Sequence, residues 1–217
     1  MTSLRRFTLA VFALALTLPA LDGARAEAER YIIDPTHTDI VFLVDHLGYS
    51  KMIGEFDDVS GSFVFDREDV ANSSVQVTVK TASIDTDLEV RDKDLRSPTF
   101  LNVQEFPEMT FESTRVEKTG EGTGKVHGEL TLLGVTRPLT LDVTFNKTGP
   151  NPIPGWENAQ GAGFSARTSL ERSNWGMDAY LPALGDRIDI LIEVEGYLES
   201  DYAKIRDKVE SMAKQLD

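Results

Sequence analysis

The sequence predicts an all-β protein, a single eight-stranded antiparallel barrel, from two observations. First, apolar and polar residues alternate with a period of two through most of the chain, which is typical of strands that bury one face. In segment 186–199, Ile188 and Ile190 fall on one face, whereas Asp189 and Glu193 fall on the other. Second, short joints separate these segments, and closing such strands into a barrel buries every apolar face and removes the free edges. A two-sheet sandwich would show the same alternation and is the alternative.

The strands and the joints between them can be placed in order along the chain. The expected strands are residues 30–46, 53–66, 73–84, 107–117, 122–133, 137–147, 160–171 and 186–199. Segments 119–124 (TGEGTG) and 133–138 (LGVTRP) predict hairpin turns. Segment 148–156 predicts a longer loop, because its prolines are excluded from a central strand.

Two segments have helical spacing instead. Segment 87–101 predicts a short helix between the third and fourth strands that ends before Pro98. Segment 200–217 repeats apolar residues at helical spacing and predicts a C-terminal helical tail, capped by Ser200 or Asp201. The charged part of the first helix has two interpretations, a lid over one end of the barrel or an ordinary surface helix.

The first 26 residues have the features of a cleavable export signal. Arg5 and Arg6 precede an apolar run at 7–21, and residues 24–26 (ARA) form the small-x-small pattern of a cleavage site. The run is too short for a good membrane span, so no stable membrane insertion is expected. The paired arginines leave open the choice between general secretory and twin-arginine export. The expected organisation is a signal peptide at residues 1–26, a barrel domain at 27–199 and a helical tail at 200–217. The mature protein is expected in the periplasm.

The composition excludes several classes of function. Removing a signal that carries three arginines and one aspartate leaves 19 basic and 35 acidic residues, a net charge of −16. Such a chain repels nucleic-acid phosphates and anionic membrane surfaces, so no nucleic-acid partner is expected. The chain has no cysteine, which excludes disulfides, thiol catalysis and cysteine-bound zinc.

Several separated motifs, in order, resemble the YceI-like family. The segment YIIDPTHTDIVFLVDHLGYSKMIGEFDDVSGSFVFD (31–66) resembles that family's opening. RDKDLRSPTFL (91–101) followed by FPEMTFEST (106–114) resembles its helix and next strand, and GELTLLGVTRPLTLDV (128–143) resembles its central hairpin. The resemblance covers about 31–198. It implies a lipocalin-like barrel that holds a long isoprenoid or similar lipid, with no established catalytic activity.

The interior face supplies the candidate binding site. The residues expected to contact a lipid are Phe42, Val44, His46, Phe63, Phe65, Val77, Phe111, Leu132, Leu141, Phe164 and Ile190. Small residues such as Ala166 and Thr168 on the same face favour a cavity, although large aromatics could also fill the barrel completely. The expected partner is a polyisoprenoid or another long-chain lipid. No cofactor or metal is expected, and a homodimer stays open.

His46 is the most polar member of this set. By alternation it shares a face with Ile40, Phe42 and Val44. It could bind a lipid head group near one mouth of the barrel, or be a hydrogen-bonded core histidine without a ligand. Catalysis or metal binding is less well supported, because no triad or ligand spacing accompanies it. Two alternative functions remain: an enzyme that acts on an amphiphile through His46, and a stress-linked structural protein whose barrel is packed solid.

Overall fold

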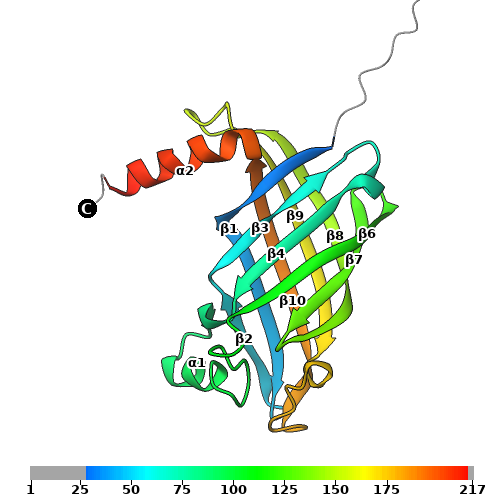
Figure 1. The fold of residues 1–217 in the computed structure, drawn as a ribbon, viewed down its shortest axis with the longest axis vertical. Helices are drawn as coiled ribbons and strands as arrows, with labels where there is room; N and C mark the ends of the chain where they lie inside the picture. Colours follow the sequence, from blue (N-terminus) through cyan, green and yellow to red (C-terminus); the bar gives the residue numbers. More distant parts are fainter. Residues whose placement is uncertain (1–27, 215–217) are drawn as a thin grey trace, which may run out of the picture.

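The computed structural model describes residues 28–214, whose strands close into the predicted antiparallel barrel (Figure 1). The strands are β1 (Glu29–His46), β2 (Ser50–Phe56), β3 (Val59–Phe65), β4 (Ser74–Lys80), β5 (Ile84–Asp85), β6 (Glu108–Gly120), β7 (Thr123–Leu132), β8 (Val135–Pro150), β9 (Gln160–Glu171) and β10 (Leu184–Leu198). The helices are α1 (Glu89–Leu95) and α2 (Glu199–Ala213), with short 3-10 turns η1 (Val70–Asn72), η2 (Thr81–Ser83) and η3 (Arg172–Trp175). The expected export signal at 1–26 lies outside the described residues.

The ten strands occupy eight positions around the ring. The end of β1 pairs with β2 and the beginning of β1 pairs with β3, so β2 and β3 lie in line. In the same way, β5 pairs with β2 and β4 pairs with β3, so β4 and β5 share the next position in the ring. Pairing of β1 with β10 closes the ring. The eight-stranded barrel is therefore confirmed, although the expected strands 53–66 and 73–84 are each interrupted, at 57–58 and at η2.

Two joints differ from the sequence prediction. The turn expected over 133–138 needs only Leu133 and Gly134, both with positive φ (50° and 72°), which is the geometry of a tight type I′ hairpin. β8 therefore begins earlier than expected. It also ends later, since Pro150 pairs with Gln160 inside the segment predicted as loop. Proline lacks the N–H of a ladder hydrogen bond, and the pairing of β8 with β9 ends at this residue.

The predicted helix between the third and fourth strands is α1, which lies beside the lower end of the barrel in Figure 1. Its last residue, Leu95, reaches the barrel interior, together with Phe100 and Leu101 from the following loop. Both of these loop residues are buried. Of the two interpretations of this helix, the structure favours a closing element, because α1 and its loop complete the barrel wall at this end.

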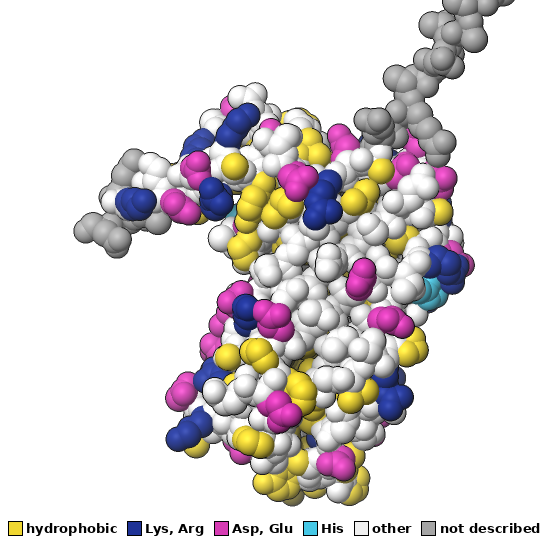
Figure 2. Space-filling view, viewed as in Figure 1, with side chains coloured by type: hydrophobic (Ala, Val, Ile, Leu, Met, Phe, Trp, Pro, Cys, Tyr) yellow, Lys and Arg dark blue, Asp and Glu magenta, His cyan; other side chains and the backbone are white. Residues whose placement is uncertain are grey.

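The C-terminal helix α2 projects from the opposite end of the barrel (Figure 1). Ile205 is buried, with Trp156 and Tyr202 packed nearby, whereas Val209 and Met212 are exposed. The predicted cap was wrong: Leu198 occupies the N-cap position and makes no side-chain capping bond. Neither α1 nor α2 is long and apolar enough to cross a bilayer. Acidic and basic side chains are interspersed over the face in Figure 2, without a block of one sign.

Candidate functional site

The barrel encloses a cavity of about 660 Å³. Ten of the eleven residues proposed for lipid contact line it, because each lies on the inward phase of its strand. These ten are Phe42, Val44, Phe63, Phe65, Val77, Phe111, Leu132, Leu141, Phe164 and Ile190. The sequence left open a barrel filled by its aromatics, and the structure shows a hollow one.

His46 is the exception, since it does not line the cavity. It is the last residue of β1, half-buried, and pairs with Ser50 of β2 and Leu184 of β10. The register between β1 and β10 shifts between Val44 and His46 by residues added to β10, whereas the pairing of β1 with β2 stays regular through His46. His46 therefore lies beyond the end of the cavity lining rather than on the opposite face of the strand. The structure therefore places His46 at a strand end beside a turn, apart from the lumen.

Aromatic rings leave space in the cavity because several of them lie against glycine. A Cβ added at Gly54 would come within 2.4 Å of the Phe42 ring, and one at Gly128 would come within 2.5 Å of the Phe111 ring. Each ring therefore rests on backbone that lacks a side chain. A larger residue at either glycine would push the ring toward the lumen.

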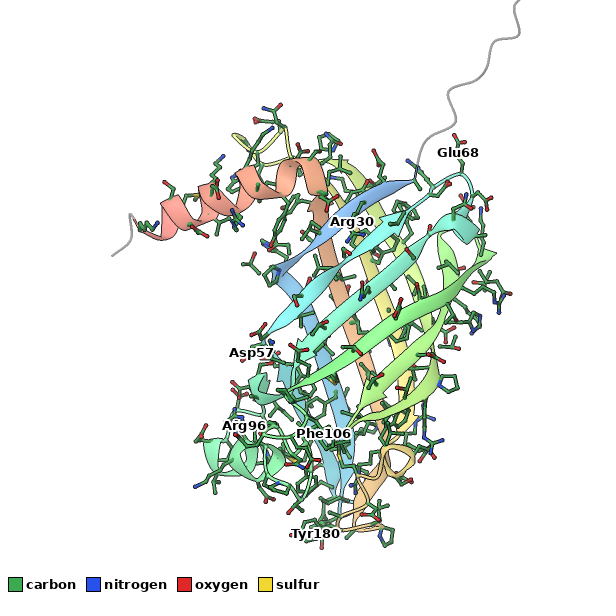
Figure 3. The ribbon with its side chains drawn as sticks, viewed as in Figure 1. Arg30, Asp57, Glu68, Arg96, Phe106 and Tyr180 are labelled. Atoms are coloured by element: carbon green, nitrogen blue, oxygen red, sulfur yellow. The ribbon has the colours of Figure 1, made fainter. Side chains whose placement is uncertain are left out.

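One end of the cavity is closed by buried side chains. Phe100 and Leu101 cover it from the loop after α1, and Met177 covers it from the segment before β10. Trp175 is also buried there, and its indole Nε1 donates to the Leu130 carbonyl at 3.3 Å. Trp175 is therefore a packing residue of the closed end. Tyr180 marks this end in Figure 3.

The buried guanidinium of Arg172 fastens the closed end together. Its Nη1 donates to the Met177 carbonyl at 2.7 Å, and its Nε donates to the Gly185 carbonyl at 2.9 Å. Its Nη2 donates to the carbonyls of Ala179 (2.9 Å) and Leu184 (3.2 Å). Burial lowers the pKa of Arg172 from its ordinary value. The sequence analysis did not select Arg172, although this residue follows Leu170 at a spacing of two and therefore shares its inward phase.

The other end of the cavity opens to solvent between the β3–β4 loop and the β6–β7 hairpin. The lining at this rim includes Arg67, Lys118 and Glu121, all exposed. The buried carboxylate of Asp66 shapes the loop: it accepts the backbone N–H groups of Glu68 (3.0 Å) and Asp69 (2.8 Å) and the Asn72 side-chain amide (2.9 Å). Figure 3 labels Glu68 on this loop, at the end of the barrel opposite to Tyr180.

Thr38 is a polar residue in the cavity wall that sequence reasoning did not select. It is buried, and its hydroxyl has no hydrogen-bond partner among the described residues. By contrast, the Thr168 hydroxyl in the same wall donates to the Thr140 carbonyl at 2.8 Å. An unpaired buried hydroxyl is costly, so Thr38 lowers the stability of the wall at this point.

An irregular stretch of β1 holds an exposed histidine against a buried carboxylate. His37 Nδ1 lies 2.8 Å from Asp34 Oδ2, and Asp34 Oδ1 accepts from the Thr36 hydroxyl at 2.8 Å. The hydrogen bond to Asp34 raises the pKa of His37 above its ordinary value. Within residues 28–214, no group of three or more acidic or histidine side chains is placed to hold a metal ion.

The fold and the cavity together define a class of protein: an antiparallel, lipocalin-like barrel with an apolar lumen that is closed at one end. The model of the YceI-like domain matches residues 31–196, and the chain belongs to this family. A UPF0312 protein of Azotobacter vinelandii is 40% identical over 186 residues, which cover 85% of this chain and 95% of the relative.

Two solved structures share the fold. BcnA of Burkholderia cenocepacia has a TM-score of 0.68 at 19% identity, covering 75% of this chain and 98% of that one. A polyisoprenoid binding domain from Saccharophagus degradans, implicated in plant cell wall breakdown, has a TM-score of 0.56 at 11% identity, covering 79% and 99%. At these identities the likeness concerns the architecture alone.

Proposed function

We propose that this protein is a non-catalytic carrier, exported to the periplasm, that holds a long isoprenoid or similar lipid chain inside its barrel. The observation that carries the proposal is the apolar cavity of about 660 Å³, closed at one end and open at the other. A solid structural barrel would lack this space. An enzyme acting through His46 would need that side chain in the cavity wall, where it is not found.

The size of the cavity sets the length of chain that it can bury. At about 660 Å³ the cavity lies within the range of roughly 300 to 1,000 Å³ that is typical of pockets for small ligands, so it can bury part of a lipid chain. Each buried methylene contributes about 0.8 kcal/mol, and ten of them give about 8 kcal/mol, near a micromolar dissociation constant before ordering costs. A much longer polyprenyl chain would extend through the open end.

Two further observations support parts of the proposal. The Saccharophagus degradans neighbour is described as binding polyisoprenoid, which is consistent with such a ligand for a barrel of this architecture. Export to the periplasm rests on the N-terminal arginines, the apolar run and the cleavage pattern of residues 1–26.

The test compares lipid content in the wild type and in a variant whose cavity is filled. Ala166 lines the cavity between Val143 and Ile192, so Ala166→Phe places a ring in the lumen. Thr144→Phe adds the same ring one residue away from Val143, on the exposed outer face, and is the matched control. Each protein is purified from the periplasm of an expressing bacterium, checked for folding by circular dichroism and weighed by native mass spectrometry.

We expect a lipid adduct on the wild type and on Thr144→Phe, and loss of that adduct from folded Ala166→Phe. Organic extraction and mass spectrometry then identify the chain. The proposal is overturned if Ala166→Phe folds and keeps the same adduct. It is also overturned if folded wild-type protein carries no lipid and binds none on titration with prenyl or acyl chains.

A further inference from the structure

Two cationic side chains continue the inward-facing series at the open rim. Arg67 follows Phe63 and Phe65 at a spacing of two, and all three line the cavity. Lys118 follows Val116 at the same spacing, and both also line the cavity. The apolar series on these two strands therefore ends in a positive charge where the lumen meets solvent.

Arg67 is positioned over the aromatic part of the wall. Its guanidinium carbon lies 5.8 Å from the centre of the Phe145 ring. That ring packs with Phe65 and Phe164 at centroid distances of 5.3 and 5.6 Å. A guanidinium stacked on a ring keeps its N–H donors available at its edge. No carboxylate lies within ion-pair distance of Arg67 or Lys118 among the residues that the structure describes.

The carboxylates near this rim differ from one another in their partners and in their place. Glu117, although it borders the cavity, is held by Arg115 at 2.6 Å and lies 3.5 Å from the His127 ring. Glu121 on the hairpin is the other rim carboxylate, whereas Glu68 on the β3–β4 loop does not line the cavity. Within the described part of the chain, the open rim thus carries two cations without an ion-pair partner, in a protein whose net charge is −14.

We propose that Arg67 and Lys118 form the head-group site of the cavity, and that the bound lipid is anionic, with a carboxylate or phosphate at the rim. This inference rests on the proposed function. Because the far end of the lumen is closed by Phe100, Leu101 and Met177, a chain enters tail first and its single head group stays at the rim. Charge-assisted hydrogen bonds from a guanidinium and an ammonium suit these oxygens.

The test uses sixteen-carbon chains that differ only in the head group. Hexadecanoate, hexadecyl phosphate and hexadecanol are titrated into delipidated wild type, Arg67→Gln, Lys118→Gln and the double variant at low and high salt, with inorganic phosphate alone as a further probe. Lys147→Gln is the matched control. Lys147 lies two residues after Phe145, but the register shift there pairs it with Gly163, outside the lining of the cavity.

We expect wild-type protein to bind hexadecanoate about tenfold more tightly than hexadecanol at low salt, with a smaller ratio at high salt. Each single Gln variant should lose about three- to fivefold for the anionic chains and nothing for hexadecanol, and Lys147→Gln should lose nothing. The double variant should bind the acid and the alcohol about equally. Inorganic phosphate alone should bind weakly, because it buries no chain.

Four results overturn the inference. Equal binding of hexadecanoate and hexadecanol to the wild type, or equal losses in Arg67→Gln and Lys147→Gln, would refute the head-group site and leave the carrier function intact. Binding of inorganic phosphate as tight as that of hexadecyl phosphate, and lost in Arg67→Gln, would indicate a free-anion site. If none of the three chains binds, the carrier function itself fails.

Discussion

Replacing Arg172 by methionine should strongly destabilise the closed end of the barrel. The guanidinium is 2% exposed and donates four hydrogen bonds to backbone carbonyls of residues 177–185. A hydrogen bond from a charged donor contributes about 1.5 to 3 kcal/mol, so four could exceed 6 kcal/mol. Two effects reduce this sum. The variant no longer buries a charge, and water can bond to some of the carbonyls of residues 177–185 that lose their donor. We therefore expect the free energy of unfolding to fall by about 3 to 5 kcal/mol.

The measurement is equilibrium unfolding in urea, followed by tryptophan fluorescence, since Trp175 is buried at this end. Arg187→Met is the control, because Arg187 is exposed and bonds to Asp189 at the surface, at 2.7 Å. Its cost should not exceed about 0.5 kcal/mol. If Arg172→Met does not fold, Arg172→Lys keeps the charge with fewer donors and should show an intermediate loss. A cost for Arg172→Met as small as that of the control would refute the role assigned to the guanidinium.

Two further changes test the polar groups of β1. Thr38→Val removes the unpartnered buried hydroxyl with little change of shape, so urea unfolding of lipid-free protein should show about 1 kcal/mol more stability; a loss would mean that the hydroxyl is bonded in solution. Asp34→Asn keeps an oxygen for Thr36 but removes the charge beside His37, so the pKa of His37, followed by NMR, should fall back toward 6.5. Because the folded-state pKa of His37 is raised, the pair stabilises the protein below pH 6.5 and loses this effect as the pH rises through the raised value. The stability difference between wild type and Asp34→Asn should therefore shrink from pH 6 to pH 8, and a constant difference would contradict it.

The barrel could be predicted from the sequence because alternation in a closed sheet directly reflects inside and outside. Ile188 and Ile190 line the cavity while Glu193 is exposed, as their phases require. The break at 57–58 could not be predicted in this way, because it results from β1 bending between two partners. The predicted cap of α2 was wrong because β10 leads directly into the helix at Leu198, so no separate capping residue follows the strand.

The candidate site was predictable only where it is made of regular strands. Phe100 and Leu101 close the lumen from a loop without periodicity, so no pattern marks them. Arg172 lies on the inward phase, but the predicted strand 160–171 ended just before this charged residue. The unpartnered state of Thr38 among the described residues depends on tertiary neighbours that one strand does not reveal.

Two register shifts, in β6 and in β8, decide which charged residues near the open rim reach the lumen. Strict alternation from Phe111 and Ser113 would turn Arg115 inward. Instead, the shift between Ser113 and Arg115 places Val116 and Lys118 in the cavity lining.

The shift after Phe145 keeps Lys147 outside in the same way. A bulge adds a residue to one strand and reverses the facing of the residues beyond it, yet it leaves no trace in the hydrophobic pattern. Near the open rim, the result is a lumen that is apolar along its length and admits a cation from β6 only at its edge. The same strand without its bulge would aim Arg115 deeper into the apolar space, where a charge is costly. The bulges therefore separate the apolar lumen from a charged rim, the arrangement that a chain with a single polar end requires.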